Sequence, residues 1–248
     1  KKDELSRPLF TGGIEIDGWQ KEGNLWFAEL PKQDGRPLYF EQLFVNNQRA
    51  VRARWPNEGF LKVKESWDEN KIDREKNIYP AVTEQSITGQ RGDLAFLKDV
   101  PADEWKFAQV VIHHHWDTTR RILLGVDLEN DRLSFKGGPQ KPHNAWREDS
   151  LYYVENVRSA FDQPREWFYD GKLGRVYYYP REGEKIDECR FIVPRNNFVR
   201  FLTIAGTPVK EGASPSEGSE KTEPTQTVPV TDIIFENLAF SYSDTPRN

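Results

Sequence analysis

The stretch QLFVNNQRAVRARWPNEGF, residues 42–60, predicts two β-strands joined by a tight turn. Asn46 and Asn47 tolerate the left-handed backbone conformation that a two-residue hairpin turn requires. The predicted strands are therefore 42–45 and 48–55. Because side chains alternate along a strand, the second strand presents two different faces to its surroundings.

The end of the second strand carries two arginines and a tryptophan. Arg52 and Arg54 lie on the same face, roughly 7 Å apart by strand geometry, and Trp55 follows them. Pro56 holds Trp55 extended and ends the strand. Two guanidinium groups beside an indole suit a hydroxyl-rich or acidic ligand. The alternative is that Trp55 packs in the core and the arginines lie on a solvated face.

The composition favours a β-rich protein without a strong overall electrostatic field. The 248 residues include 35 Lys and Arg against 40 Asp and Glu, a formal net charge of −5. This balance does not indicate a nucleic acid partner. The eight Trp, nine Tyr and fifteen Phe residues fit the cores of β-sheets and, secondarily, stacking against sugar rings.

The sequence contains no run of eighteen apolar residues, so no membrane insertion is predicted. The N-terminus lacks the apolar segment of a signal peptide, and the chain contains no Met. We therefore expect a piece of a longer, secreted or periplasmic protein whose export signal lies upstream. The single cysteine, Cys189, cannot form an internal disulfide and is expected to be inert.

Short predicted strands follow one another with turn signals every 8 to 12 residues, which favours an all-β sandwich or barrel. One helical turn is predicted after Pro101, because proline suits the first turn of a helix. Residues 61–92 are expected to be irregular. Beyond the opening hairpin, strands are predicted at two short segments within 8–17 and at 25–30, 109–116, 120–127, 150–156, 166–169, 175–179, 187–194 and 197–204.

The C-terminal part of the sequence changes character twice. Residues 207–229 are rich in Pro, Ser, Thr, Glu and Gly, a composition that predicts a flexible linker. Residues 230–241 predict two very short strands bent at Asn237, as in one rung of a parallel β-helix. Because a single rung is not stable alone, we expect the chain to stop where a repeat begins.

Four stretches together resemble bacterial right-handed parallel β-helix glycoside hydrolases, in which a β-sandwich-like domain interrupts the first coils. That group includes enzymes acting on fucosides, xylans and xylosides. The stretches are LFVNNQRAVRARWPNEGF (43–60), HHHWDTTRRI (113–122), YYVENVRSAFDQPREWFYDGKLGRVYYYP (152–180) and TDIIFENLAFSYSD (231–244).

The resemblance implies a domain organisation. Residues 1–16 would end the opening coils, 17–206 would form the inserted β-sandwich-like domain, 207–229 a flexible loop or linker, and 230–248 the first resumed rung. The rest of the same polypeptide would supply further β-helix. The catalytic carboxylates would lie on those later coils, so the resemblance assigns no catalytic residue to this chain.

The resemblance also implies substrate-binding residues for a polysaccharide or oligosaccharide. Arg54 and Trp55, together with Arg52, would face a sugar at the rim of the cleft. His114 and Trp116 match the family pattern as well. A hydrogen-bonded structural role is the preferred interpretation of His114, and substrate contact is the alternative.

The triplet His113-His114-His115 is a weak metal motif. His113 and His115 share one face of a strand, but a third ligand has no clear source. We therefore predict neither a metal nor a cofactor.

Hydrolysis of a glycosidic bond requires two carboxyl groups. The candidates in the densest aromatic region are Glu155, Asp162, Glu166 and Asp170. Asp162 and Asp170 occur in turn contexts, where a carboxylate caps backbone amides instead.

The sequence therefore predicts the N-terminal part of a secreted glycoside hydrolase that acts on plant or microbial polysaccharide, with this domain forming one wall of the cleft. One alternative is a non-catalytic carbohydrate-binding or structural β domain. A second alternative is a polysaccharide lyase.

Overall fold

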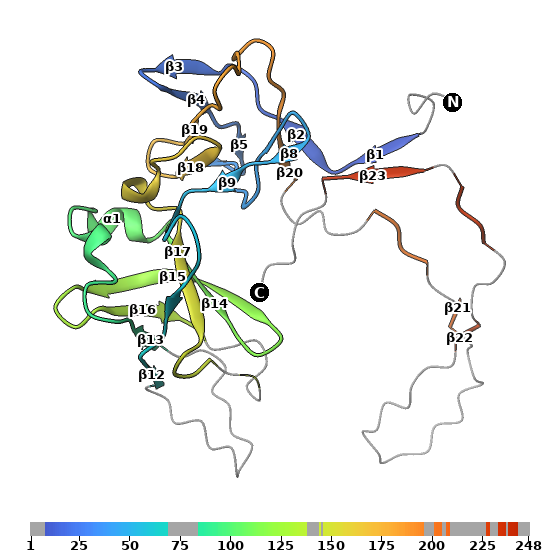
Figure 1. The fold of residues 1–248 in the computed structure, drawn as a ribbon. Coiled ribbons are helices and arrows are strands. Elements are labelled where there is room, and N and C mark those ends of the chain that lie inside the picture. The colour runs from blue at the N-terminus through green and yellow to red at the C-terminus, as the bar shows by residue number, and fades with distance from the viewer. Residues whose placement is uncertain are drawn as a thin grey trace, which may run out of the picture.

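The computed structural model describes residues 8–68, 84–137, 144, 146–195, 201–204, 207–208, 227–228, 233–236 and 238–242. Within these residues the regular secondary structure is almost all β-strand, with one short α-helix (Figure 1). It forms an eight-stranded, a five-stranded and a four-stranded sheet, and the described strands do not close into a barrel. The predicted all-β, sandwich-like fold class is therefore confirmed.

Two of these sheets pack against each other as a sandwich. The four-stranded sheet has the order β2 (Gly13–Glu15), β20 (Phe191–Pro194), β7 (Phe44–Val45), β8 (Gln48–Arg49). The five-stranded sheet has the order β3 (Gln20–Glu22), β4 (Leu25–Glu29), β19 (Arg175–Tyr178), β18 (Glu166–Asp170), β9 (Val51–Arg52).

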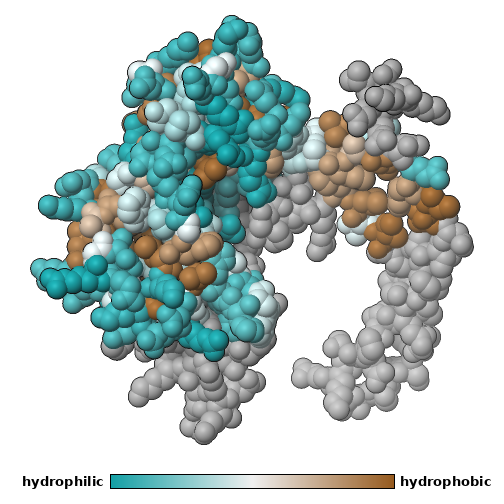
Figure 2. Space-filling model, in the orientation of Figure 1, coloured by the Kyte–Doolittle hydropathy of each residue, from teal (hydrophilic) through white to brown (hydrophobic). Residues whose placement is uncertain are grey.

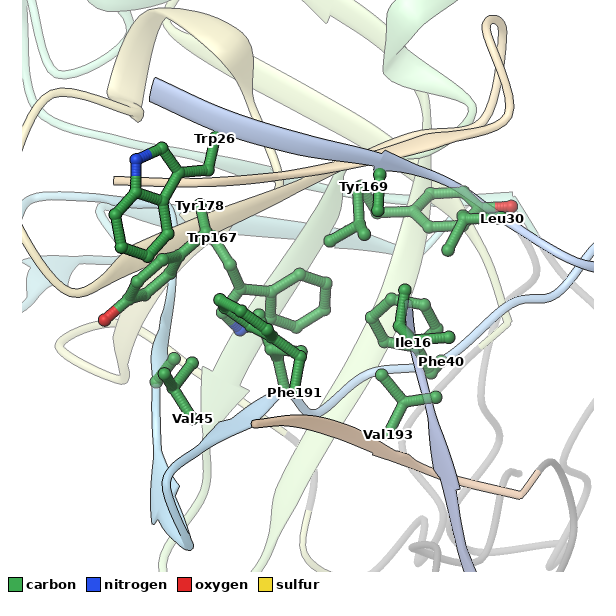
Figure 3. Close-up of a cluster of buried hydrophobic side chains, with 14 of the residues drawn as sticks. Ile16, Trp26, Leu30, Phe40, Val45, Trp167, Tyr169, Tyr178, Phe191 and Val193 are labelled. Atoms are coloured by element: carbon green, nitrogen blue, oxygen red, sulfur yellow. The ribbon is translucent and has the colours of Figure 1, made fainter. Parts of the chain in front are cut away.

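The cluster between these two sheets, here called the sandwich core, is rich in aromatic rings (Figure 3). Period-two alternation places Trp167 and Tyr178 on the inner face of the five-stranded sheet, where they are almost fully buried. Phe40 stacks on Trp167 with ring centroids 5.2 Å apart, and Phe191 meets Tyr178 edge-on at 5.7 Å. The predicted aromatic hairpin formed by β18 and β19 thus supplies one wall of this core.

The eight-stranded sheet, here called the large sheet, is antiparallel throughout. Its strands are β10 (Arg54–Trp55), β11 (Leu61–Lys62), β12 (Glu65–Asp68), β13 (Glu84–Thr88), β14 (Gln109–His113), β15 (Thr118–Asp127), β16 (Arg132–Lys136) and β17 (Leu151–Glu155). The buried cluster on it, the large-sheet core, is mainly aliphatic and includes Ile87, Ile112, Leu123 and Leu133.

The hairpin predicted in 42–60 is confirmed. Asn46 and Asn47 have φ of 51° and 63°, and β7 pairs with β8 across them. The single strand predicted over 48–55 is wrong. Its residues form β8, β9 and β10, which belong to the four-stranded sheet, the five-stranded sheet and the large sheet in turn.

The two crossings between sheets occur at alanines. The Ala50 amide donates to the carbonyl of Leu43 at 2.8 Å, and the Ala53 amide donates to the carbonyl of Trp167 at 2.8 Å. Both alanine side chains are buried. Small side chains at these points allow the sheets to approach closely, so this short stretch joins all three sheets.

Two parallel strand pairs show that one part of the described chain is enclosed, in sequence, between paired strands of another part. β9 pairs with β18, so the chain leaves the sandwich after Arg52 and returns at Glu166, having formed the large sheet in between. β1 (Leu9–Thr11) pairs with β23 (Ala239–Ser241), which brings the two ends of the described chain together (Figure 1).

Several predicted boundaries differ from the structure. β14 ends at His113, not at residue 116, because the chain turns where the His114 amide donates to the carbonyl of Asp117. The turn predicted at 117–119 therefore lies three residues earlier. Within 61–92, expected to be irregular, the structure contains β11, β12 and β13, and residues 69–83 lie outside the described part.

The remaining elements are short. The predicted helical turn is α1 (Ala102–Trp105), which begins after Pro101, and it is confirmed. No helix in the described part of the chain is long and apolar enough to cross a bilayer. The other elements are η2 (Ala95–Leu97), η4 (Arg158–Ala160), and the antiparallel pairs β5 (Lys32–Gln33) with β6 (Arg36–Pro37) and β21 (Thr207–Pro208) with β22 (Thr227–Val228).

At the C-terminal end, β23 is one of the two strands predicted for 230–241, whereas residues 233–236 form no strand and Asn237 lies outside the described residues. Most of the predicted linker, 209–226, also lies outside them. Of the strand predicted at 197–204, residues 201–204 are described and are not a strand.

Candidate functional site

A pocket of about 270 Å³ lies where the sandwich meets the large sheet, here called the junction pocket. Strands β9 and β18 contribute to it from the sandwich, and β10, β15 and β17 contribute from the large sheet. Its lining residues are Glu41, Gln42, Arg49, Ala50, Val51, Arg52, Arg54, Arg120, Tyr153, Glu155 and Trp167. The pocket therefore exists because the 48–55 stretch crosses from one sheet to another.

Arg52 forms the buried wall of the junction pocket, with only 6% of its surface exposed. Its Nη1 donates to Glu155 Oε1 and to Gln109 Oε1, both at 3.2 Å, and its guanidinium lies 5.3 Å from the ring centroid of Trp167. Burial alone would lower the pKa of Arg52, but the negative charge of Glu155 and the nearby Tyr39 hydroxyl raise it overall. Arg52 is therefore a fixed, permanently charged group.

Arg54 donates hydrogen bonds to the loop that follows it, residues 56–59. Its Nε donates to the carbonyl of Pro56 at 2.9 Å and its Nη2 to the carbonyl of Gly59. The guanidinium carbon lies 3.9 Å from the ring centroid of Tyr153, close enough for a strong cation–π contact. Burial, and secondarily Glu155, raises the pKa of the Tyr153 hydroxyl, which keeps it protonated.

The two carboxylates of the junction pocket already have partners. Glu155 Oε1 also lies 3.7 Å from Arg120 Nε. Glu41 Oε1 accepts a hydrogen bond from Gln109 Nε2 at 2.9 Å and one from the Tyr39 hydroxyl at 3.1 Å. Four arginines and two glutamates line the pocket, so it carries a formal surplus of two positive charges in a chain of net charge −5.

Trp55 does not line the junction pocket. Its half-buried ring packs against the large-sheet core and stacks on Phe96, with centroids 5.5 Å apart and planes 26° apart. One face of the indole is therefore occupied. Arg52 and Arg54 both line the pocket, but from β9 and β10 in two different sheets, so the shared face predicted along one strand is wrong. Trp55 lies outside the lining.

His114 and Trp116 lie in the turn between β14 and β15 and do not line the junction pocket. His114 Nδ1 contacts the carbonyl oxygen of Asn144, and its ring meets Trp146 edge-on at 5.4 Å. Trp116 is 59% exposed. The five residues predicted to bind substrate thus occupy three different surroundings, and their roles remain predictions.

Sequence reasoning did not place Arg120 or Tyr153 in the site. The spacing of Tyr153 and Glu155, two residues apart on one strand, is a signal that both share a face. The contact of Arg120 with Glu155 had no such signal, because it depends on how β14, β15 and β17 align across the large sheet.

The other candidate acids have structural partners. Asp170 Oδ1 accepts the amides of Lys172 and Leu173, which confirms its predicted capping role. Asp162 Oδ1 instead accepts the side-chain amide of Asn57 at 2.9 Å.

Glu166 is buried and accepts the amides of Asp162 and Gln163 at 2.9 and 3.0 Å. Burial raises the pKa of its carboxyl group. The three carboxylates Asp162, Glu166 and Asp170 are therefore engaged in holding turns and loops.

No three His, Cys, Asp or Glu side chains among the described residues are grouped closely enough to hold a metal ion. His113 Nδ1 lies 3.0 Å from Thr118 Oγ1, and the His115 ring contacts Trp116 beyond the end of β14. The shared strand face on which the chelation hypothesis rested ends at His113.

The all-β fold and the nested sheets define a β domain, and comparison with known proteins identifies its family. The family model described as "GH141 insertion domain" matches residues 23–181, most of the chain. The chain therefore belongs to the GH141 insertion domain family. The predicted relation to glycoside hydrolases is confirmed at this level.

A solved structure named "Glycoside hydrolase" is similar to this chain, with 29% sequence identity and a TM-score of 0.54. The alignment covers 75% of this chain and 32% of that protein. The chain thus spans about a third of the length of this relative. None of the curated proteins matches it.

Proposed function

We propose that this chain is part of a secreted or periplasmic bacterial glycoside hydrolase that acts on plant or microbial polysaccharide, and that its sheets form one wall of the substrate cleft. The observation that carries this proposal is the family match over residues 23–181, which include the large-sheet core, most of the sandwich core and every residue of the junction pocket. The name of the solved relative supports the same activity.

The parallel pair β1–β23 supports a further part of the proposal, that the chain begins and ends on neighbouring coils of a right-handed parallel β-helix. Leu9, Phe10 and Thr11 pair in register with Ala239, Phe240 and Ser241. Phe10 stacks on Phe240 with centroids 5.4 Å apart, as residues on successive coils do. The inserted domain would then extend from the wall of that helix.

Exposed apolar side chains gather beside this pair, where brown atoms cluster apart from the main body in Figure 2. They are Leu9, Phe10, Leu202, Ile204, Ile233, Ile234, Phe235 and Phe240, each about half exposed or more. Exposed apolar patches are typical of surfaces that become covered. Under the proposal, further coils of the same polypeptide cover them.

We place the catalytic acids on those further coils. Glycoside hydrolysis needs two carboxyl groups about 5 to 9.5 Å apart, one able to donate a proton. Asp162, Glu166 and Asp170 each accept hydrogen bonds that hold the local backbone or a neighbouring side chain. Within this chain we propose sugar contacts for Arg52, Arg54, Trp55, His114 and Trp116.

The experiment compares two tryptophans, using the full-length protein and release of reducing ends from a panel of plant polysaccharides. Trp116→Ala removes a largely exposed indole, so we expect kcat/KM to fall about 2- to 12-fold with an unchanged Tm, the value of one aromatic stack. Trp55→Ala removes an indole stacked on Phe96, so we expect a lower Tm together with weaker glycan binding.

Unchanged kinetics in both variants would contradict the proposed sugar contacts. Two alternatives give different outcomes in the same assay. A carbohydrate-binding domain without catalysis, which the engaged carboxylates favour, would bind glycan without releasing reducing ends. A polysaccharide lyase, which the arginines of the junction pocket favour because it must neutralise a uronate, would release unsaturated products that absorb ultraviolet light.

A further inference from the structure

One edge of the Arg52 guanidinium group makes no hydrogen bond within the described part of the chain. Nη1 is occupied by Glu155 and Gln109, whereas Nε and Nη2 are buried and complete no hydrogen bond within the described part of the chain. A buried charged donor without an acceptor costs free energy. Arg52 lines the junction pocket, so a ligand there would supply the missing acceptors after a small shift of the side chains that close this edge to solvent.

The two unused donors belong to the same edge of the guanidinium. Nε–H and one N–H of Nη2 point in parallel, which is the fork that matches the two oxygens of a carboxylate or a sulfate. Trp167 holds the guanidinium plane from one side and Glu155 holds its far end. The fork is therefore fixed in direction before any ligand arrives, which reduces the entropy lost on binding.

The other charges of the junction pocket favour an anion at this position. The carboxylate of Glu155 is balanced by Arg52 and Arg120, and that of Glu41 accepts hydrogen bonds from Gln109 and the Tyr39 hydroxyl. The remaining positive charge faces an incoming ligand. A neutral sugar would meet this edge with uncharged hydroxyl oxygens, whereas a carboxylate or sulfate presents two charged oxygens that match it.

We propose that the junction pocket binds the anionic group of an acidic saccharide, a uronate carboxylate or a sulfate ester, on the Nε–Nη2 edge of Arg52. Arg54 and Arg120 add positive charge at its mouth. A volume of about 270 Å³ accommodates a single substituent or sugar ring and not a longer segment of chain. This assignment rests on the proposed function and narrows its substrate to charged polysaccharides.

Calorimetric titration of the full-length protein tests the proposal with a panel of named saccharides. The panel comprises trigalacturonate, a glucuronate-bearing disaccharide, the methyl esters of both, and a sulfated galactose disaccharide. We expect a charged member to bind at least tenfold more tightly than its neutral ester, and its affinity to fall as salt is raised. The sulfated member shows whether a carboxylate or a sulfate is the natural anion.

Arg52→Lys is the decisive variant, because it keeps a positive charge beside Glu155 but removes the planar fork. We expect the charged saccharide to bind about ten to a hundred times more weakly, with the affinity for neutral esters unchanged. Arg175→Lys is the matched control, since Arg175 lies on β19, outside the pocket, and pairs with Glu29 at 2.6 Å. The Arg175→Lys variant should bind the charged saccharide with the affinity of the wild type.

If Arg52→Lys fails to fold, Arg120→Gln replaces it, because the Arg120 side chain is 43% exposed and Glu155 keeps Arg52 as its partner. A several-fold loss and a weaker salt dependence are expected. Equal binding of acids and esters, or unchanged binding by a folded Arg52→Lys variant, would overturn the acidic-saccharide proposal while leaving hydrolase activity intact. If no saccharide is bound and none is cleaved, the proposed function fails as well.

Discussion

The sandwich core and the large-sheet core are built from similar short strands but differ in composition and in chain distance. The sandwich core is aromatic, with Phe40, Trp167 and Phe191 at its centre, and it joins segments that are more than a hundred residues apart. The large-sheet core is mainly aliphatic, and it comes from one continuous part of the chain, residues 55–160. The large sheet also closes a long loop, since Arg54 pairs with Glu155, but one unbroken segment forms it, whereas the sandwich is assembled from segments on either side of that sheet.

This difference indicates that the large sheet is the more autonomous unit. A sheet formed by one continuous segment needs no strand from the rest of the chain, whereas the sandwich needs strands from before and after that segment. Large aromatic rings bury much apolar surface per residue, which suits a sandwich made of strands only two to five residues long. The first prediction tests whether the two cores open separately.

Phe135→Ala and Phe191→Ala remove matched, fully buried rings, one from each core. Each substitution should cost about 3–5 kcal/mol of unfolding free energy, measured by urea denaturation. Hydrogen exchange followed by mass spectrometry should show faster exchange over 109–136 in the first variant, and over 166–178 in the second. If either substitution speeds exchange equally in both regions, the cores form one cooperative unit and the comparison breaks down.

Local signals predicted part of this architecture. The Asn46-Asn47 turn was predictable because both residues favour positive φ, and the helical turn after Pro101 because proline fixes the first turn. The division of 48–55 among three sheets was not predictable, since alternation reveals faces but not the partner strand. Every crossing depends on distant residues, such as the carbonyl of Trp167 that accepts from Ala53.

The strands β12 and β13 escaped prediction for a different reason. β12 is at the edge of the large sheet, where a charged strand needs no apolar face. In β13, Gln85 and Ser86 are buried, and Ser86 Oγ accepts a hydrogen bond from Arg132 Nε at 2.8 Å. Polar residues at buried positions hide the pattern that identifies a strand, because their partners lie on another strand.

The candidate site shows the same limit. The motif predicted that Arg52 and Arg54 act together, and both line the junction pocket, although they lie in two sheets and share no strand face. Their partners, Arg120 and Glu155, lie on strands whose alignment the sequence does not reveal. Local chemistry was therefore predictable, but the charge balance of the pocket required the register of the large sheet.

Asn156 joins the two cores and provides the second prediction. Its Nδ2 donates to the carbonyls of Phe107 and Tyr169, and its Oδ1 accepts the Tyr169 amide at 2.9 Å. Asn156→Ala removes three hydrogen bonds, two of them buried, at a position with φ of 59°, so we expect the free energy of unfolding to fall by about 2–4 kcal/mol. Scanning calorimetry should then resolve two unfolding transitions, one for each core, because the side-chain hydrogen bonds that connect the cores are lost.

Asn130→Ala is the control for that experiment. Asn130 lies in an exposed turn, where its Nδ2 donates to Asp127 Oδ2, and its loss should change stability by less than about 1 kcal/mol. A single transition with an unchanged midpoint in Asn156→Ala would show that other contacts, such as the Arg52–Glu155 pair, hold the cores together without it.

The smallest predicted effect is a pH dependence confined to the large sheet. Burial, and then the charges of Arg120 and Arg54, lowers the pKa of His113, which lies at the end of β14. The unfolded chain, with a histidine pKa of about 6.5, then binds a proton more readily than the folded protein. The stability contributed by neutral His113 is complete above that value and declines as pH falls below it.

His113→Gln should remove this decline while leaving the stability at pH 8 nearly unchanged. The ring is partly exposed, so solvent limits the difference to less than about 1 kcal/mol between pH 8 and pH 5. Urea denaturation between pH 5 and pH 8 measures this difference, and hydrogen exchange should locate the change in residues 109–136.

An anion bound in the junction pocket would offset the charges of Arg54 and Arg120, so a saturating acidic saccharide should raise the pKa of His113. A pKa of His113 that does not move on binding would show that charge bound in the junction pocket does not reach this ring.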